Sequence, residues 1–257
     1  MTPEVTLSVV SHGQGELVAA LIADLERCVT TPIRVILTEN VPDSRWSRPG
    51  SGYPFEIEVI ENRVPKGFGA NHNAALTRAR TSYFCILNPD IRLVANPFPL
   101  LCDALADGRI GVAAPLVTNS GLEPEDHARE FPSLFTLFAK ALGSRPSTPP
   151  PVSGATYYPD WIAGMFMLFR SETLRSLGGF DEKYFLYYED VDLCARLRER
   201  DLEVAVCPAV SVIHAARRAS RRNLRYAYWH LSSAVRFFVS RPAIALGLHR
   251  RRSVSGI

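Results

Sequence analysis

The chain has 257 residues, of which 47% are hydrophobic and 21% are charged, and its formal net charge is +3. This size allows one domain with a sizeable core, and so small a net charge does not indicate a nucleic-acid-binding protein. The five cysteines show no CxxC or Cys/His ligand spacing, so neither a disulfide framework nor a zinc site is predicted. No signal peptide and no apolar run of about 18 residues is present, so a cytoplasmic protein is expected.

Short apolar segments alternate with helical patterns through the first half of the chain. The expected strands are residues 5–10, 33–40, 55–62 and 83–90, and the expected helices are residues 16–28 and 69–80. Repeats of strand, helix and strand need crossover connections, so they predict a mostly parallel sheet flanked by helices. Ligands bind at the carboxyl ends of strands in such sheets, and several polar residues follow these strands: Glu39, Asn40, Asn62, Asn88 and Asp90.

The second half is less regular. A strand is expected at residues 110–117, and two apolar segments follow at residues 161–170 and 202–216, the second of which contains a strand that ends at His214. The Pro/Ser-rich segment 144–156 suits neither a helix nor a sheet ladder, so it is interpreted as a loop that is either a lid over a bound ligand or an inert connector. Residues 1–216 are expected to form one domain, and residues 217–257 an Arg-rich helical extension.

The motif Asn88-Pro89-Asp90 follows an expected strand, and Pro89 fixes the turn between two oxygen-bearing side chains. Such a pair of oxygen donors suits a hard divalent cation that carries a diphosphate, although an Asx turn after a strand explains the same residues. His214 ends another apolar strand. A lone histidine is usually structural, and only an acidic partner such as Asp90 would make it a metal ligand.

Two glycines, Gly67 and Gly69, open the helix expected at residues 69–80, with Asn71 and Asn73 in its first turn. This arrangement presents backbone N–H groups toward an anion or a sugar hydroxyl, but a plain glycine turn before a helix has the same pattern. The segment matches neither GxGxxG nor GxxxxGK[ST]. Rossmann dinucleotide binding and P-loop chemistry are therefore disfavoured.

Three acids, Glu189, Asp190 and Asp192, directly follow the apolar and aromatic residues 184–188. A carboxylate in a segment predicted to be buried needs a partner, a metal or a proton. The acids therefore either begin a helix whose dipole stabilises them or form a reaction site. The glycines and aromatics of GGFDEKYFLYY favour a pocket wall, and Asp192 is expected to cap the helix.

In chain order, these segments resemble the family 2 glycosyltransferases, and among them the bacterial rhamnosyltransferases of surface polysaccharide and O-antigen synthesis. The matching segments are SVVSHGQGELV, VILTEN, NRVPKGFGANHNAAL, CILNPDIRL, GMFMLFRSETLRSLGGFDEKYFLYYEDVDLCARLR and the VIH that ends at His214. The resemblance covers residues 5–240. It implies a GT-A fold, with a donor half at about residues 1–115 and an acceptor half at about residues 116–216.

The resemblance implies an inverting transferase that moves a sugar from a nucleotide diphosphate to a hydroxyl of a glycan or lipid-linked acceptor, with Mg2+ or Mn2+ as cofactor. The implied donor is dTDP-L-rhamnose, with UDP-hexose and UDP-galactofuranose as alternatives. Asp190, beside Glu189, is the implied base, and Asp90 and His214 are the implied metal ligands. The implied donor-binding residues are Ser11, Glu39, Asn40, Lys66, Gly67, Gly69, Asn73, Asn88, Asp90 and Gly164. Glu39 and Asn88 depart from the family pattern, in which aspartates are common at both positions.

Two other classes of function remain open. A nucleotidyltransferase would share the sheet and the metal, but its loop after the first strand is usually basic, and SHGQGEL contains no Lys or Arg. A non-catalytic module that binds a nucleotide-sugar would keep the fold without the base, so the presence of both Asp90 and Asp190 disfavours it.

The Arg-rich extension combines arginines with aromatic residues. A basic amphipathic segment of this kind favours an anionic membrane surface, at the inner face of the plasma membrane, as a partner. A solvated arginine face, a dimer contact and a grip on the donor diphosphate are the alternatives. Nucleic acid is not an expected partner.

Overall fold

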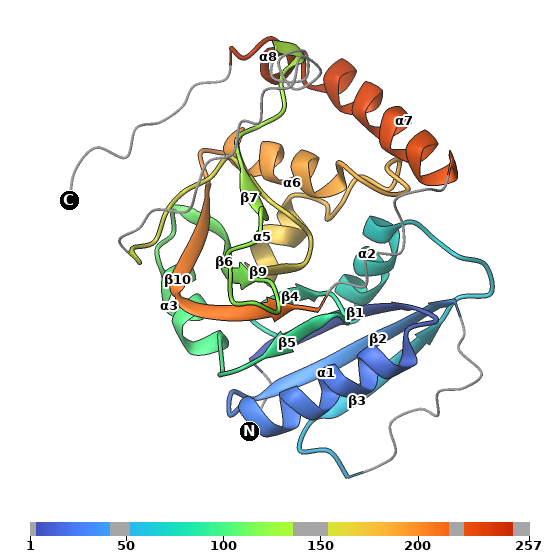
Figure 1. Ribbon diagram of the computed structural model, residues 1–257, viewed down its shortest axis with the longest axis vertical. Helices are drawn as coiled ribbons and strands as arrows, with labels where there is room; N and C mark the ends of the chain where they lie inside the picture. Colours follow the sequence, from blue (N-terminus) through green and yellow to red (C-terminus); the bar gives the residue numbers. More distant parts are fainter. Residues whose placement is uncertain (1–3, 42–51, 136–153, 216–223, 249–257) are drawn as a thin grey trace.

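The structure is a computed structural model that describes residues 4–41, 52–135, 154–215 and 224–248. A mixed sheet of eight strands forms its centre, and helices cover both faces of the sheet (Figure 1). In spatial order the strands are β3 (Glu56–Glu61), β2 (Ile33–Val41), β1 (Val5–His12), β4 (Tyr83–Leu87), β9 (Phe166–Arg170), β6 (Ile110–Thr118), β10 (Glu203–His214) and β5 (Ile91–Leu93). A separate two-stranded sheet pairs β7 (Ala128–Arg129) with β8 (Trp161–Ile162).

The strand directions explain where the sheet departs from a purely parallel one. Strands β1, β2, β3 and β4 are parallel to one another, and β6 is parallel to β10. Strand β9 runs antiparallel between β4 and β6, and β5 runs antiparallel to β10 at the edge of the sheet. The expected α/β class with a central sheet between helices is confirmed, and the reversed β9 and β5 make the sheet mixed.

The helices divide between the two faces of the sheet. They are α1 (Gly15–Cys28), α2 (Phe68–Arg78), α3 (Phe98–Ala106), α5 (Ser171–Ser176), α6 (Glu189–Arg198), α7 (Leu224–Ser240) and α8 (Pro242–Ala245). One hydrophobic cluster joins the sheet to α1 and α3, and a second joins it to α2, α5, α6 and α7. Because side chains alternate along a strand, Val35 and Leu37 of β2 enter the first cluster and Ile36 enters the second.

One expected strand is shorter in the structure, and one apolar segment is interrupted, and both features shape the site. The strand expected at residues 83–90 ends at Leu87, because the chain turns at Asn88-Pro89-Asp90 and reverses into β5. The apolar segment at residues 161–170 forms two strands, β8 and β9, separated by residues 163–165, which belong to neither strand. Periodicity alone did not reveal this interruption, since the whole segment is apolar.

The C-terminal extension packs on the domain through α7. Phe237 of α7 is fully buried, and the Ser233 hydroxyl donates a hydrogen bond to the Leu186 carbonyl at 2.9 Å. Within the described ranges no helix combines the length and the apolar character needed to cross a bilayer. The possible roles of residues 144–153 as a lid and of Arg217, Arg218, Arg221 and Arg222 as a surface fall on residues outside those described, so they remain predictions.

Candidate active site

The turn after β4 brings Asp90 beside His214. Strand β5 follows Asp90 directly and pairs with the end of β10, where Ile91 lies opposite His214. The Asp90 Oδ2 atom is consequently 3.2 Å from His214 Nε2. The acidic partner that His214 needs for a role beyond structure is therefore present, from a residue 124 positions earlier in the chain.

A second carboxylate contacts the other side of the His214 ring. Glu125 Oε2 lies 2.7 Å from His214 Nδ1. The pKa of His214 is raised to about 9, mainly by the hydrogen bond with Asp90. Burial of the ring lowers this pKa, whereas the charges of Asp90 and Glu125 and the hydrogen bond with Glu125 raise it further. Sequence reasoning did not single out Glu125, because it stands in no motif and in none of the expected elements.

The donor set at Asp90 fits a divalent cation. Among the described residues, Asp90 Oδ1 is buried and has no hydrogen-bond partner, a state that normally requires a ligand or a water molecule. Ligands at adjacent octahedral positions of a Mg2+ ion lie about 3 Å apart, which the 3.2 Å between Asp90 Oδ2 and His214 Nε2 matches. A carboxylate such as Glu125 on the second ring nitrogen is the usual way to orient a metal-binding histidine.

The protein alone does not complete a coordination shell here. No group of three or more His, Cys, Asp or Glu side chains within the described ranges could hold an ion by itself. A hard cation bound through one or two protein groups takes its remaining ligands from phosphate oxygens and water. The arrangement therefore suits an ion that arrives with a diphosphate.

Asp190 begins the second part of the site, at the start of α6. Its Oδ2 accepts a hydrogen bond from the Gly164 N–H at 3.0 Å, and its Oδ1 accepts one from the Val191 N–H at 2.8 Å. Burial raises the pKa of Asp190, and these two backbone hydrogen bonds oppose the rise. Burial, and then the neighbouring charge of Asp190, raise the pKa of Glu189 well above its usual value.

A strained turn holds these two acids in place. Tyr187 and Tyr188 have φ angles of +69° and +66°, in the left-handed region that costs a residue with a side chain roughly 1–2 kcal/mol. The rings of both tyrosines lie against His230 of α7, with centroids 5.3 and 5.5 Å away. The turn therefore directs the aromatic rings to α7 while the next two residues enter the site.

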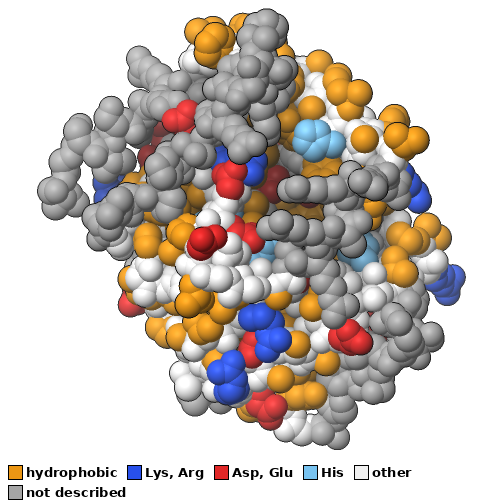
Figure 2. Space-filling view, in the orientation of Figure 1, with side chains coloured by type: hydrophobic (Ala, Val, Ile, Leu, Met, Phe, Trp, Pro, Cys, Tyr) orange, Lys and Arg blue, Asp and Glu red, His pale blue; other side chains and the backbone are white. Residues whose placement is uncertain are grey.

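Residues 163–165 connect the two parts of the site. The Gly164 N–H holds the Asp190 carboxylate, and the Met165 carbonyl accepts a hydrogen bond from the Asn88 N–H at 2.9 Å. A Cβ on Gly164 would lie 3.0 Å from the Phe68 ring, so a side chain there would require the ring to shift. Acidic side chains, with a histidine beside them, are visible near the middle of the face shown in Figure 2. Asp190, and Asn88 at the start of the turn that carries Asp90, are thus held by consecutive residues of one short segment.

Three asparagine amides form a network beneath Lys66. The Asn40 amide binds both the N–H and the carbonyl of Lys66, at 2.8 and 2.9 Å. The Asn62 amide donates to Asn40 and to Asn71, each at 2.7 Å. The amide of Asn40 is therefore engaged within the protein, and it acts on a ligand at most by positioning Lys66.

The glycines before and in α2 allow residues 180–185 to pack closely on this helix. A Cβ on Gly67 would lie 2.7 Å from the Phe185 carbonyl oxygen, and one on Gly69 would lie 2.6 Å from the Phe180 Cβ. Asn73 strengthens this contact, since its amide accepts from the Phe180 N–H at 2.8 Å and donates to the Phe180 carbonyl at 2.9 Å. These contacts account for all three residues without a ligand.

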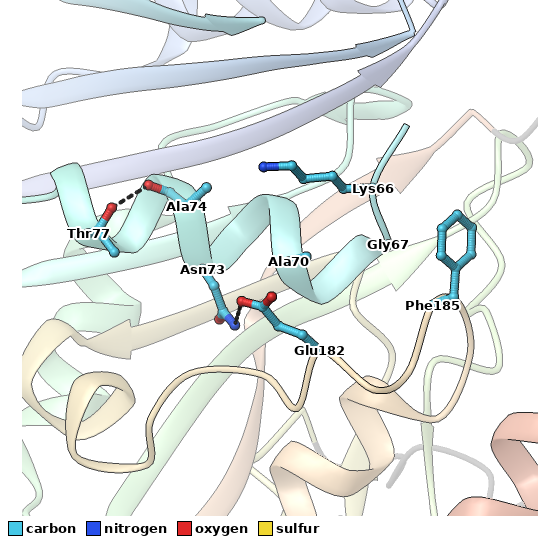
Figure 3. Close-up of a pocket in the computed structure, with 8 residues that line it drawn as sticks. All are labelled: Lys66, Gly67, Ala70, Asn73, Ala74, Thr77, Glu182 and Phe185. Carbon is cyan, nitrogen blue, oxygen red and sulfur yellow. Dashed lines mark hydrogen bonds between the residues drawn. The ribbon is translucent and has the colours of Figure 1, made fainter. Parts of the chain in front are cut away.

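An open pocket of about 440 Å³ lies along α2 and the residues that precede it (Figure 3). It is lined by Lys66, Gly67, Ala70, Asn73, Ala74, Thr77, Glu182 and Phe185. In Figure 3 the Lys66 side chain extends along the helix, away from Phe185. None of the acids at the Asp90 and Asp190 sites lines this pocket.

Ser11 and Glu39 lie together at the carboxyl ends of β1 and β2. The two residues are opposite each other in the parallel register, with Glu61 of β3 next to Glu39. The Ser11 hydroxyl accepts a hydrogen bond from the Gln14 N–H at 3.1 Å, at the start of α1. This is the edge of the sheet at which the sequence pattern placed a donor site.

The expectation that Asp192 caps α6 is wrong. The residue that precedes the helix is Tyr188, and no side chain caps its first turn. Asp192 lies within the helix, is buried, and binds Arg196 at 2.8 Å and Arg241 at 3.0 Å. Its partner Arg241 comes from the C-terminal extension, a contact that local sequence cannot reveal.

Two curated relatives match most of the chain in sequence. The rhamnosyltransferase WbbL of Escherichia coli (strain K12) is 27% identical over 253 residues, covering 94% of this chain and 95% of the relative. The N-acetylglucosaminyl-diphospho-decaprenol L-rhamnosyltransferase of Mycobacterium tuberculosis (strain ATCC 25618 / H37Rv) is 24% identical over 241 residues, covering 83% of this chain and 76% of the relative. No family model matches the chain.

Solved structures share the fold. The chain superposes on GalNAc-T7 with UDP, GalNAc and Mn2+ at a TM-score of 0.69 and 13% identity, covering 95% of this chain and 51% of that one. It superposes on the mannosyltransferase PcManGT from Pyrobaculum calidifontis, with GDP-Man and Mn2+, at a TM-score of 0.60 and 16% identity, covering 92% and 65%. The chain thus spans between half and two thirds of these two structures. Similarity in sequence and in fold supports its place among the rhamnosyltransferase-like proteins of glycosyltransferase family 2 with a GT-A fold, which confirms the resemblance carried by its motifs.

Proposed function

We propose that this protein is an inverting glycosyltransferase that moves L-rhamnose from dTDP-L-rhamnose to a hydroxyl of a glycan or lipid-linked acceptor in bacterial surface polysaccharide synthesis. The observation that carries the proposal is the attachment of Asp190 and of Asn88-Pro89-Asp90 to consecutive residues, Gly164 and Met165. Inverting transfer needs a base on one side of the sugar and a stabilised leaving group on the other. A shared anchor is a means of holding two such groups at a constant separation.

Asp190 is the proposed base. The two backbone hydrogen bonds fix the orientation of its carboxylate, and burial raises its pKa. A raised pKa improves a carboxylate as a proton acceptor near neutral pH. The neighbouring Glu189 is proposed to remain protonated and to support Asp190 rather than to accept the proton itself.

Asp90 and His214 are proposed to hold a Mg2+ or Mn2+ ion, with Glu125 orienting the histidine ring. The ion would supply charge neutralisation for the diphosphate that leaves the sugar. Asn88, with its backbone tied to Met165, is proposed to lie against the same diphosphate. Two solved neighbours of the fold contain Mn2+ together with UDP or GDP-Man, which supports a metal in this role.

The nucleotide of the donor is proposed to bind along the carboxyl ends of β1 and β2. Ser11, Glu39 and Lys66 are the proposed contacts there, and Asn40 positions Lys66 through its two hydrogen bonds. The mycobacterial relative is named for an acceptor on diphospho-decaprenol. A lipid-linked acceptor of that kind would place this protein in the cytoplasm, peripherally at the inner face of the plasma membrane.

The test is release of dTDP from dTDP-L-rhamnose in the presence of a lipid-linked acceptor, with the anomeric configuration of the product read by NMR. Asp190→Asn should lower the rate about 10²- to 10⁴-fold, the usual contribution of a positioned base. Glu172→Gln, an exposed carboxylate on α5, is the matched control and should transfer sugar at the wild-type rate. Wild-type transfer by Asp190→Asn, or retention of configuration, would overturn the assignment of the base.

A further inference from the structure

Helix α7 exposes a continuous apolar stripe. Its members are Leu224, Tyr228, Leu231, Val235 and Val239, which are 87%, 68%, 67%, 55% and 76% exposed. Their spacing of three or four residues places all five on one side of the helix along its whole length. Leu246 and Leu248, after α8, are exposed as well.

The stripe lies opposite the face by which α7 packs on the domain. The buried residues of α7 are Ser233, Ala234 and Phe237. At 100° per residue their centre falls on the far side of the helix from the stripe. Packing on the domain therefore accounts for one apolar face and leaves the second one outward. Figure 2 shows hydrophobic side chains gathered at the upper right, where Figure 1 places α7.

The last part of the sequence, which contains α7, carries charge of one sign. Residues 204–257 contain ten of the 29 Lys and Arg residues and none of the 26 Asp and Glu residues. The rest of the chain is therefore net negative, while the region that contains α7 is positive. In the helix itself, Arg225 and Arg236 lie along one edge of the stripe, and both are exposed. Their guanidinium groups lie 4.8 and 6.0 Å from the ring centroids of Trp229 and Tyr184.

We propose that the outer face of α7 lies flat on an anionic lipid surface. An apolar stripe about 25 Å long, as a 17-residue helix provides, presents one straight line of side chains to a plane, and flanking arginines bind anionic headgroups. A second copy of this chain is a less suitable occupant, because a symmetric contact would bring two arginine-rich regions together.

Helix α7 lies close to the proposed base, Asp190, which links this surface to the candidate active site. The inner side of α7 contacts the carbonyl of Leu186 and the rings of Tyr187 and Tyr188, directly before the proposed base. The stripe is then about one helix diameter, roughly 10 Å, from the strained turn. If the protein has the proposed function, a surface at this position would hold the site at the depth where a lipid-linked acceptor leaves the bilayer.

The experiment measures binding of the full chain to sedimented vesicles of phosphatidylglycerol and phosphatidylcholine. The double variant Leu231→Ser/Val235→Ser should bind roughly tenfold more weakly, since two side chains that would enter the interface are lost. Val64→Ser/Val94→Ser is the matched control, because these valines are 70% and 54% exposed elsewhere on the surface. It should bind like the wild type, and vesicles of phosphatidylcholine alone should retain much less protein.

Equal binding by the two double variants would overturn the proposal, as would equal binding to both kinds of vesicle. A third result would also overturn it: light scattering that shows a dimer for the wild type and a monomer for Leu231→Ser/Val235→Ser. Release of dTDP with a water-soluble acceptor analogue tests the proposed function separately. Loss of vesicle binding with that release intact is the result expected of the stripe variant, whereas vesicle binding without any release would refute the enzyme and not the surface.

Discussion

The substitution Asp192→Asn should destabilise the fold without removing the proposed base two residues away. Asp192 accepts hydrogen bonds from Arg196 Nε and from Arg241 Nε and Nη2, at 2.8, 3.2 and 3.0 Å. Its side chain is 3% exposed, and those of the arginines are 17% and 18% exposed. Breaking a buried ion pair by removing one partner costs about 3–5 kcal/mol. Because asparagine keeps one acceptor oxygen, we expect a loss of about 2–3 kcal/mol.

Thermal unfolding is the assay. For a chain of this length each kcal/mol lowers the midpoint by about 2–4 °C, so Asp192→Asn should unfold roughly 5–10 °C below the wild type. Glu199→Gln is the control: Glu199 is the other carboxylate partner of Arg241, but its side chain is 53% exposed. An exposed pair contributes at most about 1 kcal/mol. A midpoint for Asp192→Asn within a degree of the wild type would refute the claim that this pair attaches the C-terminal extension.

Two further predictions concern packing and pH. Gly69→Ala should lower the free energy of unfolding, measured in urea, by about 1–3 kcal/mol, since its Cβ would lie 2.6 Å from the Phe180 Cβ. The control Gly108→Ala should leave this free energy unchanged, because the space around Gly108 is open. Equal losses of stability in the two variants would contradict this reasoning. The rate of transfer should rise with pH through the raised pKa of Asp190, because a base acts in its ionised form. An acidic limb at the ordinary aspartate pKa of about 4 would contradict a perturbed base.

Local sequence was sufficient for the fold class and for the two principal acids. Apolar runs in residues 5–10, 33–40 and 83–90 predicted strands that the structure contains, although the last one ends at Leu87, because burial on both faces of a sheet requires apolar residues at consecutive positions. The same patterns placed Asp90 at the end of a strand and Glu189 and Asp190 at the start of a helix. These features depend on residues close together in the chain, so they are readable without coordinates.

The relationships within the site depended on the tertiary structure. His214 contacts Asp90, 124 positions away, and Glu125, 89 positions away. Gly164 and Met165, which hold Asp190 and Asn88, lie between β8 and β9 in a segment that the sequence showed only as apolar. Local sequence predicted that Asp192 caps a helix, whereas in the structure it lies within α6 and binds the distant Arg241. Periodicity records which side chains are buried, but it does not say which distant residue buries them. Pairings between distant residues are set by the packing of the whole chain, and only the fold decides them.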